Sequence, residues 1–206
     1  MARVGIMSTA TGSAEPNSFG WVDECAAGGQ SKDCSLAAEL GFWHRRGFNE
    51  MDDSLRVGLV SDTHGLLRPE ARAFLVGCDY IVHGGDVGAP EILDELAVIA
   101  PLIAVRGNND TAPWAAHLPA TELIRVGNIF VYVIHDLAEL DIEPGAAGIR
   151  IVVSGHSHKP VIEERGGVLY VNPGSCGPRR FRLPVCVGEI LVSGSAANAR
   201  IVDLIA

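Results

Sequence analysis

Seven polar side chains that can bind a metal ion stand where apolar runs of the sequence end. They are Asp62, His64, Asp86, Asn108, His135, His156 and His158. Carboxylate oxygens, an amide oxygen and imidazole nitrogens together suit borderline divalent ions such as Mn, Fe, Ni or Zn. The set contains no thiolate, which argues against a purely structural zinc site. The chemistry that these residue types indicate is hydrolysis assisted by bound metal ions.

Each of these residues also has an ordinary structural explanation when it is considered alone. Asp62-Thr63-His64 could be a hydrogen-bonded loop start, Gly84-Gly85-Asp86 a turn, and His135 a core histidine. Side chains two residues apart point to the same side of an extended chain, so Asp62 and His64 are expected to share a face. The joint occurrence of the whole set at successive strand ends favours one shared site.

The surrounding pattern predicts the elements that would bring these residues together. Apolar runs at 56–61, 79–83 and 102–105 indicate buried strands, and the segments 69–76 and 90–100 between them indicate helices. This alternation predicts a parallel sheet that is covered by helices. The carboxyl ends of such strands form the ligand crevice of an open α/β sheet, which is where the polar residues fall.

The second half of the chain is predicted to be mostly β-structure. Short strands are expected at 121–126, 128–135, 149–154, 161–164, 168–172, 185–192 and 199–204, with a hairpin turn at Gly127-Asn128. Two sheets that pack face to face would accommodate all of these strands. The predicted fold class is therefore α/β, a four-layer αββα sandwich of two mixed sheets flanked by helices.

Composition limits the classes of partner and compartment. The chain has 206 residues and a formal net charge of -9, which argues against anionic membranes and against nucleic acid except as a nucleotide substrate. No apolar run reaches the ~18 residues of a membrane span. Five scattered cysteines fit neither a disulfide framework nor a zinc cluster, so a reducing, cytoplasmic setting is expected.

Residues 1–53 differ from the rest of the chain. They contain small, polar, turn-rich stretches and no sustained periodicity. We expect a poorly ordered N-terminal extension over 1–53, followed by one domain over 54–206. A regulatory or docking arm is the alternative explanation for the extension.

The ordered motifs resemble those of the calcineurin-like metallophosphoesterase superfamily. The motifs are Asp62-x-His64, Gly85-Asp86, Gly107-Asn108, His135 and Gly155-His156-x-His158, and the match runs from about Arg56 to the C-terminus. The short domain and the Gly-Asn-x-Asp form resemble the small prokaryotic phosphodiesterase branch of that family. The resemblance implies an enzyme that hydrolyses a small-molecule phosphodiester.

The resemblance also implies two divalent metal ions, with manganese preferred and nickel, iron or zinc as the other candidates. One ion would be held by Asp62, His64, Asp86 and His158, and the other by Asp86, Asn108, His135 and His156. Asp86 would then bridge the two ions. A hydroxide shared between them would be the nucleophile that attacks phosphorus.

Two residues depart from the family pattern, and a basic segment accompanies the motifs. Asn109 stands where many members carry a histidine; its amide is expected to contact phosphate, but it cannot act as a general acid. Asp136 replaces the usual glycine after His135, and either orients His135 or is a loop residue. Arg179 and Arg180 are expected to contact substrate, with a solvated basic loop as the alternative.

Two other functions stay open at this point. One is a phosphomonoesterase, which includes the protein phosphatases, and the other is a non-catalytic docking scaffold of the same fold. His83 and His117 match no motif and are interpreted as structural residues. The sequence does not indicate the natural substrate, the physiological metal or the oligomeric state.

Overall fold

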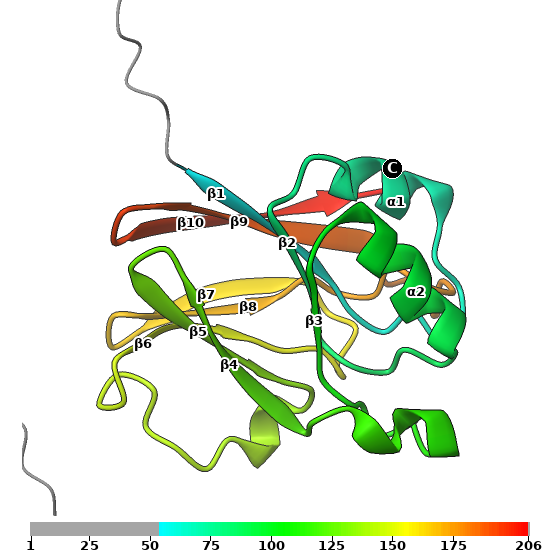
Figure 1. The fold of residues 1–206 in the computed structure, drawn as a ribbon, viewed down its shortest axis with the longest axis horizontal. Helices are drawn as coiled ribbons and strands as arrows, with labels where there is room; N and C mark the ends of the chain where they lie inside the picture. The colour runs from blue at the N-terminus through cyan, green and yellow to red at the C-terminus, as the bar shows by residue number, and fades with distance from the viewer. Residues whose placement is uncertain (1–53, 206) are drawn as a thin grey trace, which may run out of the picture. The chain divides into compact units, whose positions relative to one another are not determined.

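The computed structural model describes residues 54–205, so the extension predicted for 1–53 lies outside the described residues. Two five-stranded sheets lie face to face (Figure 1). The first has the order β10-β9-β1-β2-β3, with β1 (Leu55–Val60), β2 (Tyr80–His83), β3 (Leu102–Ala104), β9 (Cys186–Ser193) and β10 (Ala196–Asp203). The second has the order β4-β5-β6-β8-β7, with β4 (Thr121–Val126), β5 (Ile129–Ile134), β6 (Ile149–Val153), β7 (Val161–Arg165) and β8 (Val168–Asn172).

Both sheets are mixed, as predicted. In the first sheet β1, β2 and β3 are parallel, β9 pairs antiparallel with β1, and β10 pairs antiparallel with β9. In the second sheet β5, β6 and β8 are parallel, whereas β4 and β7 are antiparallel to their neighbours. The main core lies between the sheets and is built largely from β-branched side chains, including Val57, Val82, Val131, Ile151 and Ile190.

Two helices cover the outer face of the first sheet (Figure 1). They are α1 (Pro69–Leu75) and α2 (Pro90–Ile99), and each begins with a proline, whose missing N–H costs nothing in the first turn. Leu75, Ile92 and Leu96 face the sheet and pack on Val60 and Ile81. A 3-10 helix, η1 (Pro113–His117), follows β3 and contributes Trp114 to the same cluster.

The outer face of the second sheet has a thinner cover. The cover consists of the 3-10 helix η2 (Leu137–Glu139) and its flanking loop, and Leu137 and Leu140 pack on the sheet. Within residues 54–205 no α-helix covers this face. The connection from β5 to β6 contains Pro144 and Gly145, which disfavour a longer helix there. The predicted sandwich of two mixed sheets is confirmed, with α-helices on one of its two outer faces in the part that the structure describes.

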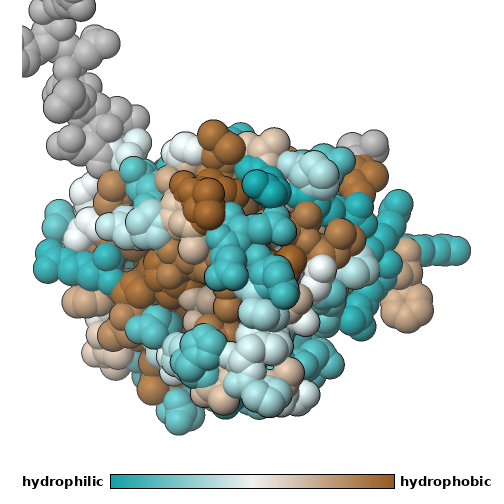
Figure 2. All heavy atoms as spheres, turned by 45° about the vertical axis from the view of Figure 1, so that its right-hand side comes forward, coloured by the Kyte–Doolittle hydropathy of each residue, from teal (hydrophilic) through white to brown (hydrophobic). Residues whose placement is uncertain are grey.

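The edge strands β3 and β4 border a shallow groove that hydrophobic side chains line, among them Leu102, Ile103 and Ile124. Figure 2 shows hydrophobic residues gathered among hydrophilic ones on this side of the molecule. No helix within residues 54–205 is long and apolar enough to cross a membrane.

Candidate metal centre

The first half of the predicted metal site is assembled at the carboxyl ends of β1, β2 and β6. Asp62, His64 and His158 each offer a ligand atom, and these atoms all lie within 4.8 Å of one another. Oδ1 of Asp62 is 3.3 Å from Nε2 of His158, and the Nε2 atoms of His64 and His158 are 3.5 Å apart. Oδ2 of Asp86 lies 3.8 Å from Nε2 of His64. Loops that are distant in sequence therefore bring the ligand atoms of Asp62, His64 and His158 together, and a carboxylate oxygen of Asp86 lies close to His64.

The second half lies beside the first and shares Asp86 with it. Oδ1 of Asp86 is 3.5 Å from Nε2 of His135, while its other oxygen faces His64. Oδ1 of Asn108 is 3.0 Å from Nε2 of His135 and 3.0 Å from Nδ1 of His156. Asp86 thus contacts a histidine of each group of candidate ligands through a different carboxylate oxygen. The structure brings all seven predicted ligands together.

Five of the seven candidate ligands hold an unusual backbone conformation. The φ angles of Asp62, His64, Asp86, His156 and His158 are 55°, 45°, 55°, 65° and 57°, in the left-handed region that L-residues rarely adopt. The expectation that an extended chain places Asp62 and His64 on one side was therefore wrong in its reason, although the two side chains do converge. Such strain persists where the surrounding structure imposes it, and it is typical of ligand sites.

The backbone around the site leaves no space for larger residues. Gly107 packs so closely on Asp86 that an added Cβ would overlap the backbone nitrogen and carboxylate of that residue. Gly177 lies in the same way against the backbone of Asp62 and Thr63. These glycines let the ligand-bearing loops approach one another closely.

Asp62 is a carboxylate that protein groups satisfy only in part. It is fully buried, and Oδ2 accepts a hydrogen bond of 2.7 Å from Ser61, but Oδ1 has no hydrogen-bond partner among residues 54–205. Burial raises the pKa of Asp62 to about 6, against the lowering effect of the Ser61 hydrogen bond. A buried, unpaired carboxylate oxygen is costly unless a cation compensates it. A divalent ion among Asp62, His64 and His158 would provide that compensation.

His64 and His158 have ring nitrogens whose lone pairs are available for a cation. Burial, followed by the charge of Arg180, lowers the pKa of His64, and the same causes lower the pKa of His158 to about 4. Nη2 of Arg180 lies 3.1 Å from Nε2 of His64, and a guanidinium can only donate, so this nitrogen is unprotonated. One positive group, the Arg180 guanidinium, therefore already lies beside an imidazole nitrogen of the site.

His135 and Asp86 form a pair whose charges are mutually stabilised. Burial alone would lower the pKa of His135, but hydrogen bonds to Asp86 and to the carbonyl of Gly84 raise it above its ordinary value. Burial alone would raise the pKa of Asp86, but hydrogen bonds from His135 and Asn109 hold it well below its usual range. Nδ1 of His135 lies 2.7 Å from the Gly84 oxygen and must donate to it, which leaves Nε2 facing Asp86.

Two residues outside the predicted ligand set hold the ligand loops together, and one of them, His83, has the structural role that was predicted for it. His83 is fully buried; its Nδ1 accepts the N–H of Gly85 at 3.1 Å, and its Nε2 lies 2.9 Å from Oγ1 of Thr63. It thereby links the loop after β2 to the loop after β1. Asp110 accepts hydrogen bonds from the N–H groups of Val87, Gly88 and Gly107 and ties the loops after β2 and β3. The Gly-Asn-x-Asp spacing was a signal for Asp110, whereas no spacing marked His83.

Asn109 and Asp136 both contact candidate ligands. The backbone N–H of Asn109 donates to Oδ1 of Asp86 at 2.8 Å, and its Nδ2 donates to Oδ2 at 2.5 Å. Oδ2 of Asp136 lies 3.6 Å from Nε2 of His156, and its Oδ1 accepts the N–H of Ala138 at the start of η2. Asp136 therefore faces His156, which neither of its two predicted roles anticipated.

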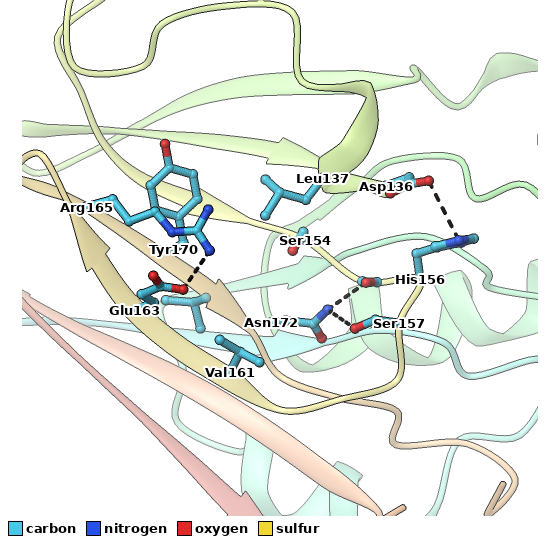
Figure 3. A pocket seen from close by; sticks show the side chains of 12 residues that line it. Asp136, Leu137, Ser154, His156, Ser157, Val161, Glu163, Arg165, Tyr170 and Asn172 are labelled. Atoms are coloured by element: carbon cyan, nitrogen blue, oxygen red, sulfur yellow. Dashed lines mark hydrogen bonds and ion pairs between the residues drawn. The ribbon is translucent and has the colours of Figure 1, made fainter.

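The two predicted substrate-binding arginines lie differently. Arg180 lines a hollow of about 350 Å³ together with Asp86, Asn109 and His158. Arg179 is exposed on the same loop and does not line that hollow. A further cavity of about 220 Å³ lies on the other side of His156, between η2 and strands β7 and β8 (Figure 3). Leu137, Val161 and Tyr170 line it, and the Asp136–His156 contact stands at its edge.

This chain is similar in sequence to known phosphoesterases. Residues 55–192 match the model of the calcineurin-like phosphoesterase superfamily domain. A probable metallophosphoesterase of Methanothermobacter thermautotrophicus is 33% identical over 162 residues, which cover 71% of this chain and 91% of the relative. The phosphodiesterase YfcE of Escherichia coli is 28% identical over 166 residues, which cover 66% of this chain and 87% of the relative.

Two solved structures show the same fold at low identity. An archaeal phosphodiesterase aligns with a TM-score of 0.61 and 21% identity over 72% of this chain and all of its own. Vacuolar protein sorting 29 of Cryptosporidium parvum aligns with a TM-score of 0.61 and 19% identity over 73% of this chain and 97% of its own. With the family model matching more than half of its length, this chain belongs to the calcineurin-like phosphoesterase superfamily.

Proposed function

We propose that this protein is a metal-dependent phosphodiesterase that hydrolyses small-molecule phosphodiesters. Asp62, His64, Asp86 and His158 would hold one divalent ion, and Asp86, Asn108, His135 and His156 the other. The observation that carries the proposal is the buried Oδ1 of Asp62, which has no hydrogen-bond partner within residues 54–205 and lies among imidazole nitrogens. Relatives that are named phosphodiesterases, one from Methanocaldococcus jannaschii and one from Escherichia coli, support the choice of reaction.

Bound divalent cations would supply positive charge that lowers the pKa of a water toward ~7 and neutralises phosphate oxygens. Manganese is the proposed ion, because oxygen and imidazole donors without thiolate suit it. The chain's own residues prepare the donors: Ser61 holds one oxygen of Asp62, Gly84 fixes the proton of His135 on Nδ1, and Asn109 donates to both oxygens of Asp86.

Arg180 gives the open side of the site a positive charge that attracts a phosphate. Asn109 cannot deliver a proton to a leaving group, so we propose diesters with acidic leaving groups as the preferred substrates. We propose a cytoplasmic setting as well, because Cys78, Cys176 and Cys186 are buried free thiols.

Two alternatives are separated from this proposal by one set of assays. A phosphomonoesterase would prefer p-nitrophenyl phosphate, whereas the proposed enzyme prefers bis(p-nitrophenyl) phosphate. A docking scaffold would turn over neither. The likeness to vacuolar protein sorting 29 concerns the fold alone and does not favour the scaffold.

The experiment loads the full chain with Mn after treatment with a chelator, measures bound metal, and compares turnover of the two nitrophenyl esters. His158→Ala should lose at least one bound ion and all turnover. His117→Ala, at an exposed position on η1, should keep the bound metal and the turnover of the wild type. No Mn-dependent turnover of either ester would overturn the proposal. Unchanged turnover in His158→Ala would overturn the site.

A further inference from the structure

The hollow beside the candidate metal ligands is lined by both polar and hydrophobic side chains. Its lining contains carboxylate, amide and imidazole side chains, and Phe181 and Leu183 are the two hydrophobic residues among those that line it. Arg180 lines the same hollow, and its Nη2 lies 3.1 Å from Nε2 of His64. A ligand whose phosphate lies beside Arg180 and the candidate metal ligands would therefore have Phe181 available for its organic part within the same hollow.

Phe181 is held in a conformation that its own contacts do not explain. Its side chain is 96% exposed, so packing of the ring contributes nothing to the folded state. Its φ of 52° lies in the left-handed region, where a bulky residue is an outlier. The N–H of Leu183 donates to the carbonyl of Arg180 at 3.1 Å and closes a turn with Phe181 at its first central position. Glycine is the usual residue at such a position.

The other end of this loop is fixed, so the aromatic ring is presented at a defined place. Nε of Arg68 donates to the carbonyl of Gly177 at 3.0 Å, and Gly177 packs against the backbone that carries Asp62. The chain from Gly177 to Leu183 thus starts at the metal ligands and returns to the hollow that they line. Strained residues that are exposed at such places are typical of ligand clamps.

We infer that Phe181 is a stacking platform for a planar aromatic arm of the substrate, either a nucleobase or an aryl group, while Arg180 lies beside the phosphate. The inference rests on the proposed function and adds a substrate class to it: phosphodiesters with at least one aromatic arm. Aromatic side chains accept any base or aryl face, because stacking does not depend on specific hydrogen bonds. Arg180 adds a cationic guanidinium, which can donate hydrogen bonds to a phosphate oxygen.

The test measures affinities of three phosphate monoesters for the Mn-loaded full chain by calorimetry. Thymidine 5′-monophosphate, phenyl phosphate and methyl phosphate carry the same phosphate group and differ in their organic arm. At least one aromatic ester should bind about tenfold more tightly than methyl phosphate. Preference for the thymidine ester would assign a nucleoside arm, and preference for phenyl phosphate would assign an aryl group next to phosphorus.

Phe181→Ala should remove the tenfold preference and leave the affinity for methyl phosphate unchanged, while Phe181→Trp should keep the preference. Val98→Ala, at an 85% exposed position on α2, is the matched control and should behave as the wild type. Phe181→Gly should fold with an unchanged or higher melting temperature, because glycine accepts the positive φ.

Equal affinities of the three esters in the wild type, or a preference that survives Phe181→Ala, would overturn the inference. Dissociation of an oligomer in Phe181→Ala, with affinities unchanged, would also overturn it and would assign the ring to a contact between copies. Turnover of bis(p-nitrophenyl) phosphate is measured in the same preparations. Mn-dependent turnover without an aromatic preference would leave the proposed function intact and refute only the stacking role.

Discussion

Replacing His83 by leucine should destabilise the domain and weaken its candidate metal centre. The side chain is fully buried, and it accepts the N–H of Gly85 and contacts Oγ1 of Thr63. The hydroxyl of Thr63 donates its proton to the carbonyl of Val87. Nε2 of His83 must therefore donate to Oγ1 of Thr63, and the imidazole is neutral. Leucine leaves the Gly85 N–H and the Thr63 oxygen without these partners, which should cost about 2–4 kcal/mol at neutral pH.

The matched variants separate hydrogen bonding from burial. His83→Gln keeps one donor and one acceptor and should lose less than half as much free energy of unfolding as His83→Leu. His117→Leu, at an exposed position, should be neutral. Urea denaturation of the metal-free proteins at pH 7 measures the free energies, and Mn titration measures the effect on the site. Equal stability of wild type and His83→Leu would refute the linking role of His83.

The pH dependence gives an independent check on the same residue. Burial lowers the pKa of His83 from 6.5 to about 4. Below pH 6.5 the unfolded chain binds a proton that the folded chain does not bind until about pH 4, so this group destabilises the fold as pH falls through that window. The stability of the wild type relative to His83→Gln should therefore fall by about 3 kcal/mol between pH 7 and pH 4. A difference that does not change with pH would refute the neutral, buried histidine.

Three further predictions concern the site. Mn at about 100 times its Kd should raise the free energy of unfolding by about 2.7 kcal/mol, which is measured as a higher melting temperature. Asp62→Ala should abolish this rise. A melting temperature that does not change with Mn would contradict the metal centre. Asp136→Asn should weaken Mn binding about tenfold because it removes the charge facing His156, whereas Glu143→Gln, at an exposed position on the same connection, should not. Gly107→Ala should lose Mn binding because its methyl group would overlap Asp86, whereas Gly145→Ala has space and should bind as the wild type, by the same titration; normal Mn binding by Gly107→Ala would show that the loop can shift.

The sequence was sufficient to predict the strands and helices and the convergence of the candidate ligands. Strands of buried β-branched residues end at polar residues, and the carboxyl ends of parallel strands must meet at one edge of a sheet. The sequence alone therefore predicts that Asp62, Asp86 and Asn108 lie close together. The predicted strands and helices end within a few residues of the observed ones, because Pro and Gly mark most of their boundaries.

The sequence by itself thus determined which residue types gather at the sheet edge, since the apolar periodicity of a strand and the residues that follow its end are local properties of the chain. Only the tertiary structure decided how they face one another. The left-handed backbone of Asp62 and His64 is imposed by the loops packed around them, not by their own preferences. The roles of His83 beneath the ligand loops and of Asp136 toward His156 depend on contacts between distant segments, which no local pattern encodes. The place of Phe181 beside the ligands has the same origin, because the loop that carries it returns to the site from the far end of the chain.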